Sequence, residues 1–292
     1  MRSLLFVPAD APRKVEKALE SGADALILDL EDSVAAGGKA AARDQAAASI
    51  ARLRGRGEGP RLFVRVNGLD TGLTDDDLAS VMPARPDGIV LPKAVCGPDI
   101  DALGARLAVH EAVIGLPAGA TRILPIATET ARAVLALLKP PAGNPRLCGL
   151  TWGAEDLSAD LGAEANRDAA GAWTGPYLLA RDLTLLAAAA AEVDAIDTVH
   201  LGYRDPAALE RECRDARRDG FCGKLAIHPA QVPVINAAFS PSDEDLAEAR
   251  AVVAAFAAAP GTGVIGRDGR MLDAPHLRRA RRLLARQDRA GE

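Results

Sequence analysis

Short apolar runs recur along the chain, and the segment between each pair is long enough to hold one helix. The runs are almost continuously apolar instead of alternating with polar residues, which is typical of parallel strands covered on both faces. They lie at Ser3–Pro8, Ala25–Leu30, Arg61–Val66, Gly88–Pro92, Arg122–Ala127, Leu147–Trp152, Thr198–Leu201 and Lys224–Ile227. A set of about eight such strands is the number that a (β/α)8 barrel needs.

Helical patterns fill the spaces between these runs. They lie at Ala11–Ser21, Lys39–Arg54, Thr74–Val81, Ile100–Glu111, Glu129–Leu138, Pro176–Ala191 and Pro206–Asp219. A doubly wound open sheet would show the same alternation, but its nucleotide-binding fingerprint, Gly-x-Gly-x-x-Gly directly after the first strand, is missing. We therefore predict an α/β fold, a (β/α)8 TIM barrel that forms a catalytic domain over residues 1–235.

The chain continues past the predicted eighth strand. Residues 242–259 form an alanine-rich helical pattern that starts with acidic residues, and Ala274–Arg286 is a basic amphipathic pattern. The glycine-rich stretch between them is predicted to be flexible. The eightfold repeat has no place for these elements, so residues 236–292 are predicted to be a C-terminal helical extension. It would be a lid on its own barrel or an arm onto a neighbouring subunit.

Composition restricts the partners and the compartment. Only 3% of the 292 residues are aromatic and the net charge is -5, which argues against nucleic acid as a partner. The apolar run at the start is too short for a signal peptide or a membrane span. The four cysteines form no Cys-x-x-Cys pair. We therefore expect a soluble protein of the reducing cytoplasm with no membrane partner.

Polar side chains follow the predicted strands, at the end of a parallel barrel where active sites lie. They are mostly acidic and comprise Asp29, Glu31, Asp32, Arg65, Asn67, Lys93, Glu129, Glu155, Asp156 and His228. A barrel with only a structural role would not need an acid or base at nearly every strand end. This pattern predicts an active site at the carboxyl ends of the strands.

Glu129 and Asp156 are the candidate metal ligands, because they follow adjacent strands. Two hard carboxylate oxygens completed by water favour Mg²⁺ over zinc. Each acid could instead be a helix N-cap or a first-turn residue, where acids are also favoured. Adjacency in the barrel favours the metal interpretation for the pair.

Arg65 is the candidate catalytic cation at the end of the third strand. A guanidinium there could bind a carboxylate or stabilise an enolate oxygen. It could also form a structural ion pair with Asp29, Glu31 or Asp32. Catalysis is favoured because the metal candidates are predicted at the same mouth of the barrel. His228, followed by Pro229, is interpreted as a hydrogen-bonded structural residue. Trp152 and Trp173 are interpreted as packing residues, and His200 has no predicted place.

Read in order, several segments resemble those of the citrate lyase β-subunit, malyl-CoA lyase and citramalyl-CoA lyase family. The segments are Leu5-Phe-Val-Pro8, Asp29-Leu-Glu-Asp-Ser-Val34, Arg65-Val-Asn-Gly-Leu-Asp-Thr71, Leu91-Pro-Lys93, Gly153-Ala-Glu-Asp-Leu157, Gly223-Lys-Leu-Ala-Ile-His-Pro229 and Asp268-Gly-Arg-Met-Leu-Asp273. The resemblance runs from about residue 2 to residue 285, and ordered motifs over that length are far more specific than any one of them.

The resemblance implies a homo-oligomer, a homotrimer or a dimer of trimers, whose Mg²⁺ is held by Glu129 and Asp156. Arg65 would stabilise the thioester enolate, and Asp273 would be an acid/base that reaches a neighbouring subunit's site. Asp273 could instead be the N-cap of a helix that begins near Pro275. The substrate would be a coenzyme A thioester, with an α-keto acid as the second partner. Relatives often carry an arginine for coenzyme A at position 11, where this chain has alanine. Arg13, Lys14 and Lys17 could substitute for it, and Arg13 and Lys17 are the candidates chosen.

The resulting hypothesis is a lyase that cleaves or forms the carbon–carbon bond of a β-hydroxyacyl-CoA of the malyl or citramalyl type. A thioesterase or a malate-synthase-like activity in the same site stays open, as does a citrate lyase β-subunit that works on an acyl carrier protein. An aldolase of the pyruvate class is less favoured, because its usual histidine base after an early strand is not evident. A non-catalytic subunit would not need the acidic strand ends and Arg65.

Overall fold

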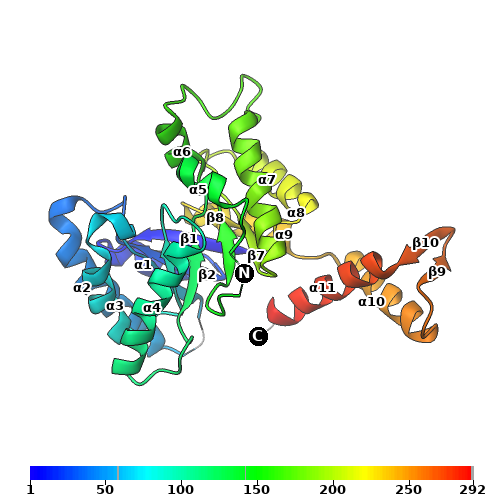
Figure 1. Cartoon of the computed structure of the whole chain (residues 1–292), viewed down its shortest axis with the longest axis horizontal. Helices are drawn as coiled ribbons and strands as arrows, with labels where there is room; N and C mark the ends of the chain where they lie inside the picture. The colour runs from blue at the N-terminus through cyan, green and yellow to red at the C-terminus, as the bar shows by residue number, and fades with distance from the viewer. Residues whose placement is uncertain (58, 142, 291–292) are drawn as a thin grey trace. The chain divides into compact units, whose positions relative to one another are not determined.

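The computed structural model describes residues 1–57, 59–141 and 143–290. Within these residues, eight parallel strands form one sheet, with helices around its outside (Figure 1). The strands are β1 (Ser3–Pro8), β2 (Ala25–Asp29), β3 (Arg61–Arg65), β4 (Gly88–Leu91), β5 (Arg122–Pro125), β6 (Gly149–Thr151), β7 (Asp194–Asp197) and β8 (Gly223–Ala226). The prediction of a (β/α)8 barrel is confirmed.

The sheet closes on itself between β5 and β6. Its strand order is β5-β4-β3-β2-β1-β8-β7-β6, and isolated parallel bridges join Ile123 to Leu147 and Ile126 to Thr151. The backbone N–H of Ala127 also donates to the carbonyl of Thr151 at 2.8 Å. The tips of β5 and β6 are therefore held side by side, as the metal hypothesis requires.

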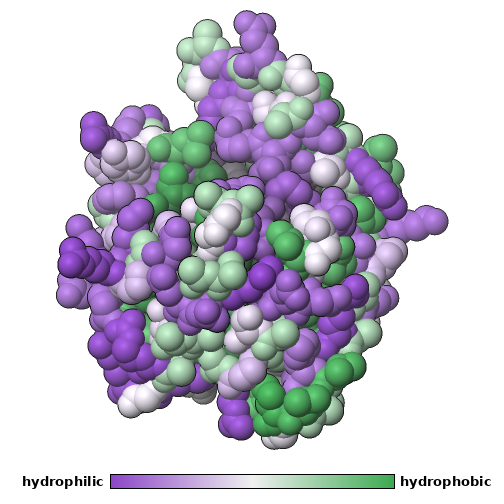
Figure 2. Space-filling model, turned by 90° about the vertical axis from the view of Figure 1, so that its left-hand side faces the viewer, coloured by the Kyte–Doolittle hydropathy of each residue, from purple (hydrophilic) through white to green (hydrophobic). Residues whose placement is uncertain are grey.

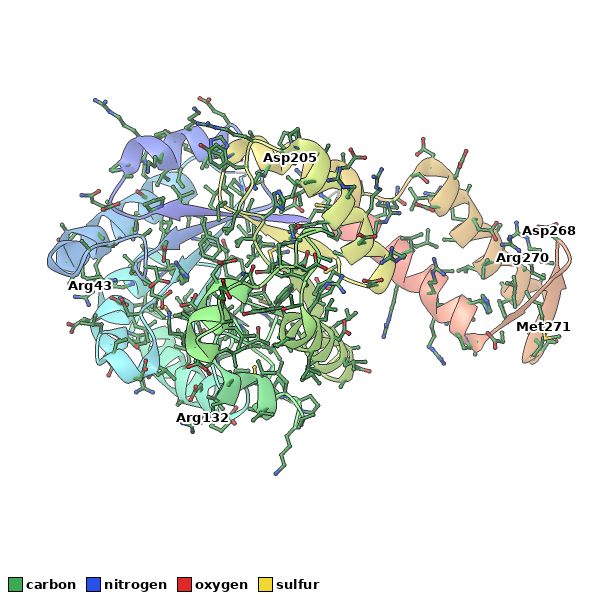
Figure 3. All side chains as sticks on the ribbon, turned by 90° about the horizontal axis from the view of Figure 1, so that it is seen from above. Arg43, Arg132, Asp205, Asp268, Arg270 and Met271 are labelled. Carbon is green, nitrogen blue, oxygen red and sulfur yellow. The ribbon has the colours of Figure 1, made fainter. Side chains whose placement is uncertain are left out.

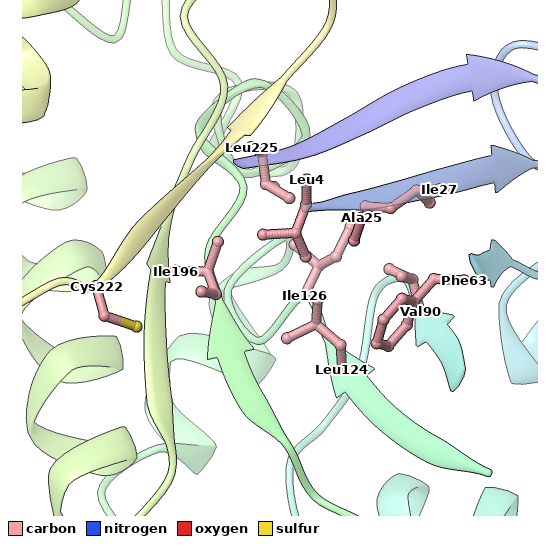
Figure 4. Close-up of a cluster of buried hydrophobic side chains, with 10 residues drawn as sticks. All are labelled: Leu4, Ala25, Ile27, Phe63, Val90, Leu124, Ile126, Ile196, Cys222 and Leu225. Carbon is pink, nitrogen blue, oxygen red and sulfur yellow. The ribbon is translucent and has the colours of Figure 1, made fainter. Parts of the chain in front are cut away.

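The interior of the barrel is filled by side chains from its strands (Figure 4). The cluster consists of Leu4, Ala25, Ile27, Phe63, Val90, Leu124, Ile126, Ile196, Cys222 and Leu225. Gly88 leaves the space that the Phe63 ring occupies, because a Cβ at position 88 would overlap the ring. Close packing of this kind makes the barrel a rigid support for the strand ends.

The first nine α-helices described connect the strands and continue past β8. They are α1 (Pro12–Leu19), α2 (Lys39–Arg54), α3 (Thr74–Val81), α4 (Pro98–Val113), α5 (Ala131–Ala136), α6 (Ala154–Leu161), α7 (Gly175–Ala190), α8 (Pro206–Asp219) and α9 (Val232–Phe239). Short 3-10 helices occur at η1 (Ala36–Gly38), η2 (Leu69–Thr71), η3 (Met82–Ala84) and η4 (Pro229–Gln231). Helix α8 begins where predicted, because Pro206 takes the first helical position and Asp205 caps the backbone N–H of Ala208.

The seventh strand lies earlier than predicted. Strand β7 covers Asp194–Asp197, whereas the apolar pattern placed it at Thr198–Leu201, so that prediction is wrong. The acidic residues at both ends of β7 hid the strand in the hydropathy pattern. The carboxylate of Asp197 is nevertheless buried, because it accepts hydrogen bonds from Trp152 and Lys224. A paired charge can be buried where an unpaired one could not.

The chain divides into two compact units, Met1–Asn236 and Ala237–Glu292. The second unit contains α10 (Asp243–Ala258), a hairpin of β9 (Val264–Arg267) and β10 (Arg270–Asp273), and α11 (Ala274–Ala290). Its small core joins Ala249, Val252, Leu272 and Ala280. None of the described helices is both long and apolar enough to cross a membrane.

Part of the glycine-rich stretch forms this hairpin, which the sequence did not predict. Asp268 and Gly269 form the turn with positive φ angles of 49° and 73°, and Asp268, Arg270 and Met271 are labelled in Figure 3. A two-residue Asp-Gly turn with positive φ at both positions suits the twist of a hairpin. The glycine is therefore there for the turn geometry.

Hydrophilic side chains dominate the face shown in Figure 2, with hydrophobic ones in smaller groups. Several apolar side chains on the outer helices are exposed, including Val113 on α4 and Leu138 after α5. Exposed apolar residues are normal on a protein surface.

A buried ion pair ties the approaches to β5 and β6 together. Arg146 donates to both carboxylate oxygens of Glu111 on α4, at 2.6 and 2.7 Å. The same carboxylate accepts the backbone N–H groups of Gly119 and Thr121, just before β5. Burial alone would raise the pKa of Glu111, but these partners outweigh it and lower the pKa to about 2. The pair therefore holds together the sector in which the barrel closes.

We predict that Glu111→Gln lowers the free energy of unfolding by about 3 kcal/mol, because it leaves the Arg146 guanidinium buried without a counter-charge. Urea unfolding followed by circular dichroism measures the loss. The matched control is Glu210→Gln, which removes an exposed pair with Arg214 and should change the stability by less than about 1 kcal/mol.

The loss should also depend on pH. The carboxylate form of Glu111 stabilises the fold above the ordinary pKa of 4.5, and this contribution disappears as the pH falls toward 2. The difference in the free energy of unfolding between wild type and Glu111→Gln should therefore become smaller as the pH falls toward 2. Equal stability of Glu111→Gln and wild type at neutral pH would contradict the role of the pair.

Candidate active site

The carboxyl ends of β2 to β6 bring the predicted site residues together. Because all strands of the barrel run parallel, their ends open on one face. The charged side chains there are Asp29, Glu31, Arg65, Lys93, Glu129 and Asp156.

Arg65 is held as a rigid donor by the acids that follow β2. Its Nε and Nη2 donate to the two oxygens of Asp29, each at 2.7 Å, and its Nη1 lies 2.9 Å from Glu31 Oε2. The guanidinium also lies over the Phe6 ring at 4.8 Å. The ion pair considered as an alternative to catalysis is therefore present, and it also fixes the direction of the guanidinium.

Asp29 is specialised to hold this arginine. Besides Arg65, its carboxylate accepts the backbone N–H groups of Glu31 at 2.9 Å and Ser33 at 3.2 Å. Burial alone would raise the pKa of Asp29, but the hydrogen bonds and charge of Arg65 outweigh it, and the pKa is lowered. These contacts fit a carboxylate that orients Arg65.

A second set of contacts fixes the main chain at the ends of β2 and β3. Lys39 Nζ donates to the carbonyls of Leu30 and Glu31, each at 2.7 Å, and to Asn67 Oδ1 at 2.8 Å. Asn67 in turn donates its backbone and side-chain N–H groups to Asp77 Oδ2 at 2.7 Å. The loop that carries Glu31 thus has little freedom to move relative to Arg65.

Lys93 connects three acids of the site. Its backbone N–H donates to Glu129 Oε2 at 2.5 Å, while its Nζ donates to Glu31 Oε1 at 2.5 Å and lies 3.3 Å from Asp156 Oδ1. Its φ of 51° lies in the left-handed region, which costs energy for a residue with a side chain. The sequence placed Lys93 at a strand end but indicated no role, because nothing in Leu91-Pro-Lys93 reveals this backbone conformation.

Glu129 is a buried carboxylate with an excess of negative charge around it. It is 2% exposed, and burial followed by the charge of Asp156 raises its pKa to about 8. Gly153 permits this crowding, because a Cβ at position 153 would lie 2.6 Å from Glu129 Cγ. A cation between Glu129 and Asp156 would relieve the repulsion, so these two residues could hold a divalent metal.

The structure also bears on the helix-cap alternatives. Thr130, not Glu129, caps α5, because its hydroxyl accepts the backbone N–H of Ala133 at 3.1 Å. Asp156 does lie in the first turn of α6. Over residues 1–57, 59–141 and 143–290, no three His, Cys, Asp or Glu side chains form a metal cage. Two carboxylates with water and substrate oxygens are the usual Mg²⁺ arrangement.

Other elements carry the remaining candidates. Arg13 and Lys17 are exposed on α1, one helical turn apart, directly after β1. Asp273 ends β10 in the second unit, where its Oδ1 lies 2.7 Å from His276 Nδ1. His228 has the structural contacts predicted for it, because its Nδ1 accepts the backbone N–H of Ala230 and its ring stacks on Tyr203.

The chain matches known proteins over nearly its full length. The family described as HpcH/HpaI aldolase/citrate lyase matches residues 2–229, and a C-C bond lyase family of the TIM-barrel fold matches residues 179–291. A citrate lyase subunit beta-like protein of Mycobacterium tuberculosis is 38% identical over 289 residues, which cover 99% of this chain and 95% of that protein. A (3S)-malyl-CoA thioesterase of Cereibacter sphaeroides is 36% identical over 290 residues, which cover 98% of this chain and 94% of that protein.

Solved structures agree with this assignment. The crystal structure of the protein CitE from Mycobacterium tuberculosis, in complex with magnesium, acetoacetate and coenzyme A, has a TM-score of 0.73 to this structure. It is 36% identical, and the match covers 100% of this chain and 98% of that one. The chain belongs to the HpcH/HpaI aldolase/citrate lyase family.

Proposed function

We propose that this protein is a Mg²⁺-dependent carbon–carbon lyase that cleaves or forms the bond between an acyl-CoA and an α-keto acid. Its substrate would be a β-hydroxyacyl-CoA of the malyl or citramalyl type. The observation that carries this proposal is the buried Glu129 beside Asp156, in a site that also presents the fixed guanidinium of Arg65. The magnesium, acetoacetate and coenzyme A bound by the similar CitE structure support the same chemistry.

Glu129 and Asp156 are the proposed Mg²⁺ ligands. Their charges are poorly balanced in the protein alone, since Lys93 is shared with Glu31 and burial disfavours the anion of Glu129. A bound Mg²⁺ would act as a Lewis acid on the oxygen of the keto acid. The hydrogen bond from the Lys93 backbone to Glu129 Oε2 fixes the orientation of that carboxylate before the metal binds.

Arg65 is proposed to stabilise the thioester enolate. Breaking the carbon–carbon bond leaves negative charge on the thioester oxygen, and a donor fixed in advance stabilises that charge without reorganising. Nε donates to Asp29, and Nη2 and Nη1 lie against Asp29 and Glu31, so the second N–H of each of these two nitrogens is proposed to contact the substrate. The carboxylate of Asp29 keeps the guanidinium pointing the same way throughout.

Asp273 is proposed as the acid/base that removes the proton of the substrate hydroxyl during cleavage. Its carboxylate is about half exposed at the end of the β9–β10 hairpin, next to His276. A segment in a separate compact unit suits an arm that reaches the active site of a neighbouring subunit. On the family resemblance, we propose a homotrimer or a dimer of trimers. Arg13 and Lys17 would contact the nucleotide end of coenzyme A, and the protein would act in the cytoplasm.

A thioesterase activity in the same site is the second candidate. The observation that favours it is the 36% identity to a relative named (3S)-malyl-CoA thioesterase. A water molecule that attacks the acyl carbon would give free coenzyme A in place of an acyl-CoA. Incubation of the protein and Mg²⁺ with a panel of β-hydroxyacyl-CoA esters, followed by mass spectrometry, separates the two. A keto acid with acyl-CoA indicates the lyase, and free coenzyme A without a keto acid indicates the thioesterase.

Two further versions of the function are tested in the same series. A citrate lyase β-subunit that works on an acyl carrier protein would not bind free coenzyme A thioesters, which calorimetry would show. A malate-synthase-like activity would condense an acyl-CoA with a keto acid, and water would then hydrolyse the thioester and release free coenzyme A.

The first prediction for the site concerns the metal. Glu129→Gln and Asp156→Asn should each weaken Mg²⁺ binding by at least about tenfold, because each removes one of two anionic ligands. Calorimetry with Mg²⁺ measures the affinity. Asp182→Asn is the matched control, since Asp182 on α7 is 62% exposed, and its Mg²⁺ affinity should equal that of wild type. Full turnover in excess chelator would refute the metal requirement.

The second prediction concerns Arg65. Arg65→Lys keeps the positive charge but loses the planar set of N–H donors of the guanidinium. The kcat should therefore fall on the order of 10²-fold, the usual effect of losing one oxyanion donor. Steady-state kinetics separate kcat from KM. A change confined to KM would show that Arg65 anchors the substrate and takes no part in the transition state.

The third prediction concerns Asp273 and the oligomer. Asp273→Asn should be folded and nearly inactive, and Arg65→Ala should be inactive as well. If the arm is exchanged between subunits, mixing the two variants and reassembling the oligomers should restore part of the activity, because some sites combine an intact Arg65 with an intact Asp273. The control is reassembly of each variant alone. A mixed oligomer that stays inactive would indicate an arm folded over its own barrel.

A further inference from the structure

Six side chains outside the proposed catalytic set form a closed ring of contacts around the ends of β6 and β7. We call it the tryptophan–arginine ring. Its members are Trp152, Asp197, Lys224, Glu212, Arg167 and Trp173. They come from the end of β6, from β7, β8 and α8, and from the loop between α6 and α7, so the ring joins segments that are far apart in the sequence.

One half of the ring is ionic and buried. Trp152 Nε1 donates to Asp197 Oδ1 at 2.8 Å, and Lys224 Nζ donates to Asp197 Oδ2 at 2.6 Å. Lys224 Nζ also lies 3.4 Å from Glu212 Oε2, and His200 Nδ1 lies 3.1 Å from the same oxygen. Trp152 and Lys224 are fully buried. These contacts leave the indole of Trp152 no alternative position without breaking a buried hydrogen bond.

The other half of the ring passes through the α6–α7 loop. Arg167 Nη2 lies 2.7 Å from Glu212 Oε1, and the guanidinium lies 3.5 Å from the centre of the Trp173 ring. Trp173 meets Trp152 edge to face, with ring centres 5.1 Å apart. A cation over an indole face and an edge-to-face aromatic pair are both attractive. The loop is therefore attached to the barrel through these side chains.

The charges of the ring balance. Asp197 and Glu212 carry two negative charges, and Lys224 and Arg167 carry two positive ones. Removing one charged member leaves its partner with less compensation, which is costly where the partner is buried, as Lys224 and Asp197 are. The four charged side chains therefore support one another.

The ring bears on the proposed metal site through residues 152–156. Trp152 is the residue between β6 and Gly153, and Asp156 follows in the first turn of α6. At the other side of α6, Asn166 precedes Arg167 and donates to Glu155 Oε1 at 2.8 Å. The ring therefore holds residues 152–156 at their first residue, Trp152. It also holds the α6–α7 loop, which contacts Glu155, the residue before Asp156.

We propose that the tryptophan–arginine ring positions Asp156 for the metal, with Trp152 and Arg167 as positioning residues that do not touch substrate or metal. The inference rests on the proposed function, since it assigns these residues to the Mg²⁺ site. It replaces the interpretation of Trp152 and Trp173 as packing residues alone.

The test uses two variants that break the ring at different points. Trp152→Phe removes the indole N–H but keeps an aromatic ring, and Arg167→Met removes the guanidinium, whose side chain is only 28% exposed. Each should weaken Mg²⁺ binding by about tenfold in calorimetry, in line with one lost hydrogen bond to a charged group. Arg167→Lys should recover part of the affinity, because an ammonium can still pair with Glu212.

A second readout comes from fluorescence. The chain has two tryptophans, and both belong to the ring. Titration of the full-length wild type with Mg²⁺ alone should change the tryptophan emission with the same midpoint as calorimetry. In Arg167→Met, the emission change should become smaller and shift to higher Mg²⁺ concentration. A role confined to stability would lower the unfolding temperature but leave the midpoint unchanged.

Arg214→Met is the matched control for Arg167→Met. It removes an exposed ion pair with Glu210 on α8, the helix that also carries Glu212, and should leave both readouts as in wild type. If Trp152→Phe does not fold, Arg167→Met and Arg167→Lys still decide the question. Folded ring variants that bind Mg²⁺ as tightly as wild type would overturn this inference alone. A wild type that binds no Mg²⁺ would overturn the proposed function, and the inference with it.

Discussion

Closure of the barrel between β5 and β6 is the constraint on which the site depends. The two strands meet through isolated bridges, and the buried pair of Glu111 and Arg146 ties their approaches together. Closure brings Glu129, after β5, against Gly153, after β6, with no room for a Cβ between them. The crowding of two carboxylates at this point is thus a consequence of the topology. An open sheet with the same strands would leave β5 and β6 on opposite edges.

The barrel mouth concentrates charge, and the structure shows how that charge is kept in place. Arg65 is matched by Asp29, whose pKa is lowered, while Lys93 reaches both Glu31 and Asp156. Glu129 stays the least compensated group, with its pKa raised to about 8. Buried charges without partners cost stability, and such sites are where proteins bind cations or substrates. The rigid packing of the barrel core supplies the support that this arrangement requires.

Two kinds of support surround the proposed metal ligands. On the side of β2 to β4, Lys39, Asn67 and the strained backbone of Lys93 fix the loops through hydrogen bonds. On the side of β6 to β8, the tryptophan–arginine ring does so through buried ion pairs and aromatic contacts. The family relationship explains the barrel and the chemistry, whereas these supports are read from the contacts of this chain. The second unit, which carries Asp273, has its own small core and its own hairpin.

The sequence by itself determined the fold class and most of the elements, and it predicted the location of the candidate site. Continuous apolar runs mark strands covered on both faces, and terminal signals such as Asp205 before Pro206 mark helix starts, so β1, α2, α3 and α8 have the predicted bounds. The acidic strand ends identified Glu129, Asp156 and Arg65 as a group, because parallel strands open on one face.

Only the tertiary structure decided the rest. Strand β7 was hidden because its buried acid, Asp197, is compensated by Trp152 and Lys224, which are distant in sequence. The role of Lys93 depends on a left-handed backbone, and that of Gly153 on a neighbour 24 residues away, Glu129. Local patterns record what each segment buries, but they do not record which distant charges and side chains will meet it.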